Sequence, residues 1–342
     1  MTLTTAALVL AACGSQDSPT SDSAASPTDA AAASEGGYPV EVPNCGRTVT
    51  LEAAPERIVS LNQGTTEMLL TLGVEERMVG TATWTDPVLP QLADANDEVP
   101  RLAENNPSLE TVLARQPDLV TASFSGTLSP GGVAPYERFE QLSVPTYLSH
   151  VECQKAEPGD GTSDGTRTEA LTLDDIAQDI RDLAALTDTR AQGEHLIGDL
   201  ESRMAAIEPV EGTEPTTVVF WFANAESPYV AGGLGAPELI ADRVGLTNVY
   251  ADRSEEWPQV GWEDIAAKNP DIIVLGDLTR RSQTAETAEA KIDFLESNPV
   301  TAQMDAVRNK RYISLPGGDM NPSIRTVDGT EKVAEGVREL GS

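Results

Sequence analysis

The sequence contains little of the residues on which metal and nucleic-acid binding depend. It has two histidines and three cysteines, and its 23 lysines and arginines face 55 aspartates and glutamates, for a net charge of -32. A zinc site takes about three or four histidine, cysteine or carboxylate ligands. His150 and Cys153 make one pair and His195 is the other histidine, so we expect no metal site. The strong negative field excludes nucleic acid and anionic lipid as direct partners.

Long apolar runs are also scarce, and we find none that is long enough to cross a bilayer. The chain opens with MTLTTAALVLAAC, in which Leu10, Ala11 and Ala12 precede Cys13 as in a bacterial lipoprotein signal. Residues 14–37 are small, polar and low in complexity, which is typical of a flexible tether. We therefore expect lipid attachment at Cys13, which would hold the protein at the extracellular face of the cell membrane through this anchor only.

With Cys13 assigned to the lipid, two cysteines remain in the body of the chain. Outside the cytoplasm, two such thiols normally form a disulfide. We therefore predict a bond between Cys45 and Cys153, and we favour it over a metal site built on His150 and Cys153.

What the sequence does contain is one short motif written twice. LETVLARQPDLV, residues 109–120, and WEDIAAKNPDII, residues 262–273, align at a constant offset of 153 positions. Four positions are identical in the two copies, namely Glu110 and Glu263, Ala114 and Ala267, Pro117 and Pro270, and Asp118 and Asp271. Each copy predicts a helix, a Pro-Asp turn and a strand. The duplication indicates two lobes of related structure.

Strand and helix signals alternate around both copies, which predicts parallel α/β sheets. A helical run between the two halves breaks at residues 187–189 and stops at Pro209. We predict a lipoprotein signal at 1–13, a disordered tether at 14–37, an N-terminal lobe at 38–188, a linker helix at 189–209 and a C-terminal lobe at 210–342. The fold class is therefore α/β, with two Rossmann-like lobes joined by a single long helix and a ligand cleft between them.

The order of these segments resembles a known family. PERIVSLNQGTTEMLLTLGVEERMVG, PSLETVLARQPDLV, a helical linker and WPQVGWEDIAAKNPDIIVL are similar to the helical-backbone substrate-binding proteins of ABC importers, from about Pro55 to the C-terminus. The resemblance implies a monomeric, non-enzymatic protein that needs no cofactor and delivers its ligand to an ABC permease dimer. We place a ferric siderophore-type chelate first, because that branch is the most populous. A corrinoid, haem or another cofactor precursor such as a deazaflavin is the alternative.

A secreted hydrolase is the alternative of another class. ASFSGT lacks the first glycine of the Gly-x-Ser-x-Gly nucleophile elbow, and neither histidine has an evident partner. A nucleotide site at GGLGAPE would need a glycine where Glu238 stands. Both departures favour a binding protein over an enzyme.

Aromatic residues make up only 4% of the chain, so the position of each ring is informative. Loops that follow strands are where parallel α/β lobes place ligand contacts, and flat chelates bury well against aromatic faces. By resemblance, the residues that fall where family members line the cleft are Trp84, Phe124, Tyr229 and Trp257. Ordinary core packing is an equal alternative for each of them. Trp221 is a further candidate for ligand contact, and the aromatic residue that we most expect in the core.

Two polar residues complete the candidate ligand site. In most family members the loop after the first strand reads Ser-Pro-x-x-Thr-Glu, whereas here it reads LNQGTTE, so that Gln63 stands at this position. Arg325 lies near the position of a cleft arginine that some relatives use, and a guanidinium suits carboxylate, catecholate or hydroxamate oxygens. A surface salt bridge is the alternative for Arg325.

The two copies of the motif each begin with a glutamate, Glu110 and Glu263, in the first turn of a predicted helix. A carboxylate there interacts favourably with the positive end of the helix, which is one explanation for both residues. In the family, this pair meets arginines on the two permease subunits. The resemblance therefore implies that Glu110 and Glu263 dock the protein on its permease.

Overall fold

The N-terminal lobe is built on a parallel sheet of five strands. The computed structural model describes residues 37–156, 165–209, 216–280 and 283–341. The strand order is β5-β4-β3-β6-β7, with β3 at Ile58–Ser60, β4 at Met78–Ala82, β5 at Arg101–Ala103, β6 at Leu119–Ala122 and β7 at Thr146–Leu148. Strands β3 and β6 are buried along their whole length, as is typical of a parallel sheet that is covered on both faces.

Helices and one hairpin surround this sheet. An antiparallel hairpin of β1, Val40–Asn44, and β2, Arg47–Leu51, precedes it. The α-helices of the lobe are α1 Gln63–Thr71, α2 Ala93–Asp97, α3 Leu109–Leu113, α4 Tyr136–Gln141 and α5 His150–Cys153. The 3-10 helices are η1 Glu75–Arg77, η2 Pro90–Leu92 and η3 Ser125–Leu128.

The C-terminal lobe repeats this plan with a second five-stranded sheet. Its strands are β10 Thr216–Ala223, β11 Tyr229–Val230, β12 Leu246–Asn248, β13 Ile272–Asp277 and β14 Tyr312–Pro316. Strand β10 pairs in parallel with β12 and β13, β13 pairs in parallel with β14, and the short β11 is antiparallel to β10. The α-helices are α8 Ala236–Val244, α9 Trp262–Lys268, α10 Ala288–Ser297, α11 Asp305–Arg308 and α12 Arg325–Gly341. The 3-10 helices are η4 Thr301–Gln303 and η5 Gly317–Met320. The α/β fold class is therefore confirmed.

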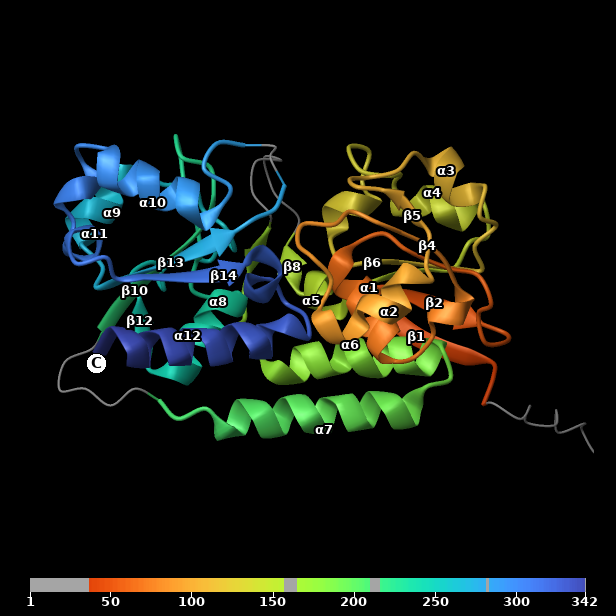
Figure 1. Ribbon diagram of the computed structural model, residues 1–342. Helices are drawn as coiled ribbons and strands as arrows, with labels where there is room; N and C mark the ends of the chain where they lie inside the picture. The colour runs from red at the N-terminus through yellow and green to blue at the C-terminus, as the bar shows by residue number, and fades with distance from the viewer. Residues whose placement is uncertain (1–36, 157–164, 210–215, 281–282, 342) are drawn as a thin grey trace, which may run out of the picture. The chain divides into compact units, whose positions relative to one another are not determined.

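Two helices lie between the lobes in the sequence. Helix α6, Leu173–Leu186, starts at a capping box formed by Thr172 and Asp175, and α7, Arg190–Ala206, runs alongside α6 and contacts α12 (Figure 1). The end of α7 is fixed because Arg243 of α8 donates hydrogen bonds to backbone carbonyls at its last turn. The linker helix predicted at 189–209 thus corresponds to α7.

A second connection joins the lobes through a short hairpin. Strand β8, Lys155–Ala156, pairs with β9, Thr166–Arg167. The N–H of Arg167 donates to the carbonyl of Ser254, and the N–H of Leu171 donates to that of Leu234. Residues 165–171, which the sequence places with the N-terminal lobe, are therefore hydrogen-bonded to the C-terminal one.

The duplicated motif has the same local structure in both lobes. Equivalent positions after the two helices are in the left-handed conformation: Gln116, three residues after the end of α3, with φ of 51°, and Asn269, at the end of α9, with φ of 43°. The aspartate that follows then accepts backbone N–H groups at the start of the neighbouring strand region: Asp118 from Glu56 and Arg57, Asp271 from Thr217, all at 2.8 Å. Each Pro-Asp turn thus ties its helix to the sheet.

The hydrophobic core does not stop at the boundary between the lobes. One buried cluster includes Ile58 and Leu69 of the N-terminal lobe, Ile180 of α6, and Ile240 and Val333 of the C-terminal lobe. Two smaller clusters fill the remaining side of each sheet. Among the helices that the structure describes, none combines the length and the apolar character needed to span a membrane.

Candidate functional site

A cavity of about 990 Å³ lies between the two lobes. Most of its wall comes from segments that follow strands: Thr85 after β4, Phe124 and Ser125 after β6, and Arg280 after β13. The carboxyl ends of parallel strands are where α/β lobes place ligands. The cavity is therefore where the fold itself predicts a binding site, and its size is that of a pocket for a sizeable small molecule.

Aromatic rings from both lobes line this cavity. Phe124 of the N-terminal lobe is 37% exposed, which is unusual for a large apolar side chain here. In the C-terminal lobe, Phe222 of β10 packs against Trp257 with 4.8 Å between ring centroids. Such surfaces bury flat, apolar parts of a ligand.

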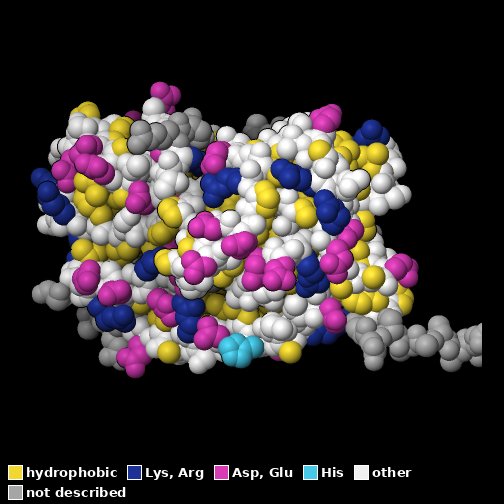
Figure 2. All heavy atoms as spheres, turned by 45° about the vertical axis from the view of Figure 1, so that its right-hand side comes forward, with side chains coloured by type: hydrophobic (Ala, Val, Ile, Leu, Met, Phe, Trp, Pro, Cys, Tyr) yellow, Lys and Arg dark blue, Asp and Glu magenta, His cyan; other side chains and the backbone are white. Residues whose placement is uncertain are grey.

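The charged side chains in the wall are mostly paired with one another. Lys155 forms ion pairs with Glu152 of its own lobe and with Glu256 of the other lobe, and all three side chains are buried. Arg47 pairs with Glu137 at 2.6 Å. Acidic and basic side chains are also interspersed on the surface that Figure 2 presents. The wall therefore carries charge without a large excess of either sign.

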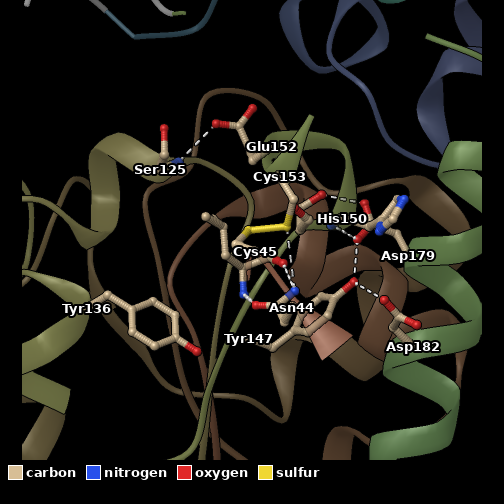
Figure 3. The surroundings of a disulfide bond; sticks show 12 residues. Asn44, Cys45, Ser125, Tyr136, Tyr147, His150, Glu152, Cys153, Asp179 and Asp182 are labelled. Carbon is tan, nitrogen blue, oxygen red and sulfur yellow. Dashed lines mark hydrogen bonds between the residues drawn. A yellow bond between two sulfur atoms is a disulfide. The ribbon is translucent and has the colours of Figure 1, made fainter. Parts of the chain in front are cut away.

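One side of the cavity contains a disulfide (Figure 3). Cys45, in the β1–β2 turn, is bonded to Cys153 at the end of α5, and both residues line the cavity. Next to it, the Asn44 side chain donates to the Leu148 carbonyl at 2.7 Å and accepts the Leu148 N–H at 2.9 Å. The bond predicted between Cys45 and Cys153 is confirmed, and it attaches the hairpin to α5, while Asn44 attaches the hairpin to the end of β7. Among the residues that the structure describes, no cluster of side chains is suited to hold a metal ion.

A buried acidic cluster lies beside the disulfide, where α6 faces β7 (Figure 3). The Tyr147 hydroxyl is 2.6 Å from Asp179 and 3.1 Å from Asp182, and Asp179 also accepts from the Ser149 hydroxyl and the His150 N–H. Burial raises the pKa of Asp179 to about 6, although these hydrogen bonds lower it. Burial also raises the pKa of Asp182. Asp182 also accepts the Gln178 side-chain amide, so each carboxylate has a donor besides the Tyr147 hydroxyl that they share.

A second polar cluster joins the lobes directly. The Asp86 carboxylate accepts the N–H groups of Gly317 at 3.2 Å and Gly318 at 2.6 Å, and burial raises the pKa of Asp86. Nearby, the Arg325 guanidinium bonds to the Glu67 carboxylate and to the carbonyl of Pro87. These contacts fix η5 and the start of α12 against the N-terminal lobe.

Of the predicted ligand residues, Phe124 and Trp257 lie in the wall of the cavity. Trp84 does not, because its ring is covered by the guanidinium of Arg101 at 4.4 Å. Tyr229 is partly buried against the core. Trp221 is fully buried and stacks edge-on against Trp262 at 4.7 Å, so it is a core residue, as the alternative interpretation held.

The two predicted polar contacts are occupied within the protein. The amide oxygen of Gln63 accepts the N–H groups of Thr85 and Asp86, and its NH₂ donates to Glu67. Arg325 is buried in its ion pair with Glu67 and is neither a cavity-lining residue nor a surface salt bridge. Gln63 therefore ties α1 to the loop after β4 within the N-terminal lobe, whereas Arg325 joins the two lobes. Neither side chain lines the cavity.

Two further residues of the cavity wall, Phe222 and Arg280, were not predicted from the sequence. Neighbouring residues of a strand point to opposite faces, so Trp221 and Phe222 in TTVVFWFA cannot both face the cavity. Both faces of this strand are apolar, so the sequence pattern does not show whether Trp221 or Phe222 faces the cavity. Arg280 follows the strand of the second motif copy, as Phe124 follows the strand of the first. The duplication could have drawn attention to the loop after β13, although the offset of 153 pairs Phe124 with Asp277 rather than with Arg280.

Glu110 and Glu263 occupy equivalent places outside the cavity. Each is exposed and lies in the first turn of its helix, α3 or α9, and Figure 1 shows these helices at the upper ends of the two lobes. Hydrogen bonds from its own backbone N–H and from the Ser108 hydroxyl lower the pKa of Glu110. The predicted lipidation residue Cys13, the signal at 1–13 and the tether at 14–37, except Gly37, lie outside the described residues.

Two α/β lobes, joined by helices and enclosing a cavity at the carboxyl ends of their strands, define a two-lobed ligand-binding protein. The sequence model of the family described as periplasmic binding protein matches residues 58–317. The chain belongs to this family.

The individual relatives and solved structures share about a quarter of their aligned residues with this chain. The vitamin B12-binding protein of Pectobacterium atrosepticum is 26% identical over 231 residues, which cover 66% of this chain and 72% of that protein. A periplasmic binding protein from Veillonella parvula superposes with a TM-score of 0.73 at 23% identity, covering 88% of this chain and 97% of the other. A protein described as the ABC-type Fe3+-hydroxamate transport system of Saccharomonospora viridis gives 0.71 at 24% identity, over 88% and 99%. At this identity the two structures support the fold alone.

Proposed function

We propose that this chain is the substrate-binding protein of an ABC importer, and that it captures a ferric siderophore-type chelate outside the cell for delivery to a permease. The observation that carries the proposal is the cavity, because it is lined by aromatic rings from both lobes. A ligand held there contacts Phe124 on one side and the Phe222–Trp257 pair on the other. A large chelate with apolar surface suits this arrangement better than a small polar solute.

The charged residues around the cavity reduce the range of candidate ligands further. Five of the six charged residues in the described part of the wall are already in close ion pairs, and the whole chain carries -32. A strongly anionic complex such as a tris-catecholate would be repelled at long range. The site therefore favours a chelate that carries little net charge, such as a ferric trihydroxamate.

A corrinoid is the second candidate, and the relatives favour it. The curated relative reported above is described as a vitamin B12-binding protein, and the alignment covers 72% of its length. A corrin ring is also large, flat and low in charge, so the same aromatic surfaces would accommodate it.

A thermal-shift screen separates the candidates. Ferric trihydroxamates, cobalamin, haem and a deazaflavin are added to the purified chain, with the metal-free hydroxamates as controls. A ligand at a hundredfold excess over Kd stabilises the folded state by about 2.7 kcal/mol, so its melting temperature rises measurably. A shift with one class identifies the ligand. No shift with any class, together with turnover of an ester substrate, would favour the secreted hydrolase instead.

Two exposed apolar residues provide a matched pair of variants. Phe124 and Leu142 are each 37% exposed, and Phe124 lines the cavity whereas Leu142 does not. We expect Phe124→Ala to weaken ligand binding about tenfold and Leu142→Ala to leave it unchanged, by isothermal titration. Equal effects of the two substitutions would place the ligand elsewhere.

We also propose that Cys13 carries the lipid anchor. The experiment is labelling of cells with radioactive palmitate, in which the wild-type chain should incorporate label and release into the medium should follow Cys13→Ala. Equal labelling of the two chains would contradict the anchor and leave the ligand proposal intact.

A further inference from the structure

Arg280 differs from the other cations in the wall of the cavity. It follows β13 and lines the cavity, with its side chain 31% exposed. Its guanidinium lies over the ring of Phe222, 5.3 Å from the centroid, and Phe222 in turn packs against Trp257. A guanidinium on an aromatic face is held in a defined orientation.

The three cations in the described part of the wall are Arg47, Lys155 and Arg280. Arg47 donates to Glu137 at 2.6 Å and to Glu140 at 3.2 Å, and Lys155 bonds to carboxylates from both lobes. Arg280 makes no hydrogen bond to any residue that the structure describes. Among these three wall cations it is therefore the one that donates no hydrogen bond to a described residue.

The carboxylate closest to this guanidinium does not satisfy it. Nε of Arg280 is 3.7 Å from Oε2 of Glu286, which is beyond hydrogen-bond distance. That Nε is buried without a partner in the described structure, and so are both carboxylate oxygens of Glu286, a side chain that is only 3% exposed. Buried polar groups without partners are rare in folded proteins, and a missing ligand or water is a usual cause.

The exposed part of the Arg280 side chain is the part that a ligand can reach. Nε is buried on the side of Glu286, whereas the side chain as a whole is 31% exposed and lines the cavity. A guanidinium presents parallel N–H groups that match two oxygens of one anionic group. The adjoining Phe222–Trp257 surface accommodates an apolar ring beside that group.

We propose that Arg280 binds an anionic oxygen group, a carboxylate or a phosphate, which the ligand carries next to an apolar face. This inference rests on the proposed function, because it assigns a charged substituent to the same chelate. It also specifies the chelate, whose overall charge is small but whose periphery includes one anionic group. A chelate without that group binds more weakly.

Two pairs of ligands test whether Arg280 binds an anionic group, and they distinguish a carboxylate from a phosphate. The first pair is a ferric trihydroxamate with a free carboxylate and its methyl ester. The second pair is cobalamin and cobinamide, which lacks the phosphate-containing nucleotide. Affinities are measured by isothermal titration for the wild type, Arg280→Gln, Arg280→Lys and the control Arg101→Gln. Arg101 is a fair control because it also lies over an aromatic ring, that of Trp84, outside the cavity.

We expect the wild type to prefer the anionic member of one pair by about tenfold or more, as is usual for a charge-assisted hydrogen bond. Arg280→Gln should abolish this preference and change the affinity for the ester or for cobinamide by less than about twofold. Arg280→Lys should keep part of the preference, and Arg101→Gln should keep all of it. Circular dichroism verifies that each variant is folded.

Three results would overturn the inference. If a chelate binds but neither pair shows a preference that depends on Arg280, the proposed function stands and Arg280 only pairs with Glu286. If Arg280→Gln weakens both members of a pair equally, the residue supports the shape of the cavity and does not recognise charge. If no chelate binds to the wild type, the proposed function and the subsite both fail.

Discussion

The carboxylate of Glu67 and the guanidinium of Arg325 face each other across the boundary between the lobes. Nε of Arg325 is 2.6 Å from Oε2 of Glu67, and Nη2 is 2.5 Å from Oε1. Their side chains are 0% and 5% exposed, and 258 positions separate them in the sequence. Two parallel bonds fix the mutual orientation as well as the distance. This pair thus holds the start of α12 in one position against α1 of the other lobe.

Loss of either partner should destabilise the protein strongly, because it removes the bidentate partner of a buried charge; without Glu67, the only ion pair that Arg325 keeps with a described residue is the longer one with Asp319 at 3.4 Å. We expect Glu67→Gln and Arg325→Gln each to lower the free energy of unfolding by about 3–5 kcal/mol. The double variant Glu67→Met with Arg325→Met should lose less than either single variant, since it buries no charge. Urea denaturation followed by circular dichroism measures all three.

The exposed pair of Arg101 and Glu104 is the control for this prediction. Its side chains are 38% and 73% exposed, so Glu104→Gln should cost less than about 1 kcal/mol. Losses of that small size in the Glu67 and Arg325 variants would contradict the structural role of the buried pair.

Asp179 should make stability depend on pH between about 4 and 6. Burial raises the pKa of Asp179 to about 6 from the 3.8 of an unperturbed aspartate. In this window the folded state binds more protons than the unfolded state, so its stability falls as the pH rises. The contribution is complete below pH 3.8 and is lost above 6, by up to about 3 kcal/mol. Asp179→Asn should remove this fall, measured as the difference in unfolding free energy at each pH.

Asp175 in the same helix provides a control of opposite sign. Burial raises its pKa, but hydrogen bonds from Thr172 and Gln154 outweigh this and lower it below 3.8. Its contribution is therefore present above pH 3.8 and is lost only at lower pH. Asp175→Asn should leave the slope between pH 4 and 6 as in the wild type. If Asp179→Asn also keeps that slope, Asp179 is not the group responsible.

The duplicated motif predicts equal effects of equivalent substitutions. Asp118 and Asp271 each accept N–H groups at the start of the adjacent strand region, at 2.8 Å. We expect Asp118→Ala and Asp271→Ala each to cost about 1–2 kcal/mol of stability, and the double variant to cost their sum. Glu98→Ala, an exposed change outside the motif, should be neutral. Strong non-additivity would show that the two turns are coupled.

The features that the sequence predicted correctly depend on local patterns. The Pro-Asp turns of the two copies, the break between α6 and α7 and the Cys45–Cys153 pairing all follow from short-range signals or from a count of cysteines. Each is determined largely by residues close in the chain or by the absence of other partners. Such features do not require knowledge of how the lobes pack.

The ligand residues that were predicted wrongly from the sequence are determined by contacts between segments that lie far apart in the chain. Arg325 was expected at the ligand from the family resemblance, and no local signal shows that Glu67, 258 positions away, occupies its guanidinium. Trp84 likewise follows a strand, but its ring is turned to Arg101. A residue that follows a strand lines the cavity only if its side chain is not already paired with a neighbouring charge or packed against an apolar surface. Whether such a partner is present depends on how the whole chain folds.

The last prediction concerns Glu110 and Glu263. Helix stabilisation could explain a carboxylate in the first turn of either helix, at about 0.3–1 kcal/mol each. It does not explain why α3 and α9 keep it at the same position of a duplicated unit, on exposed surface in both lobes. We propose that the two carboxylates meet cationic groups on the two permease subunits. Paired charges at opposite ends of one interface set its orientation and accelerate encounter.

The double variant Glu110→Arg with Glu263→Arg separates docking from ligand binding. We expect ligand affinity to stay within about twofold and ligand uptake by cells to fall at least about tenfold, because two attractive contacts become repulsive. Glu226→Arg with Glu289→Arg makes the same change of charge at acidic residues outside the two motif copies, and should transport normally. The unfolding free energy of the docking variant should drop by no more than about 2 kcal/mol, the helix-end contribution of both residues. Normal uptake by a folded, ligand-competent double variant would contradict the docking role and leave helix stabilisation as the explanation for both glutamates.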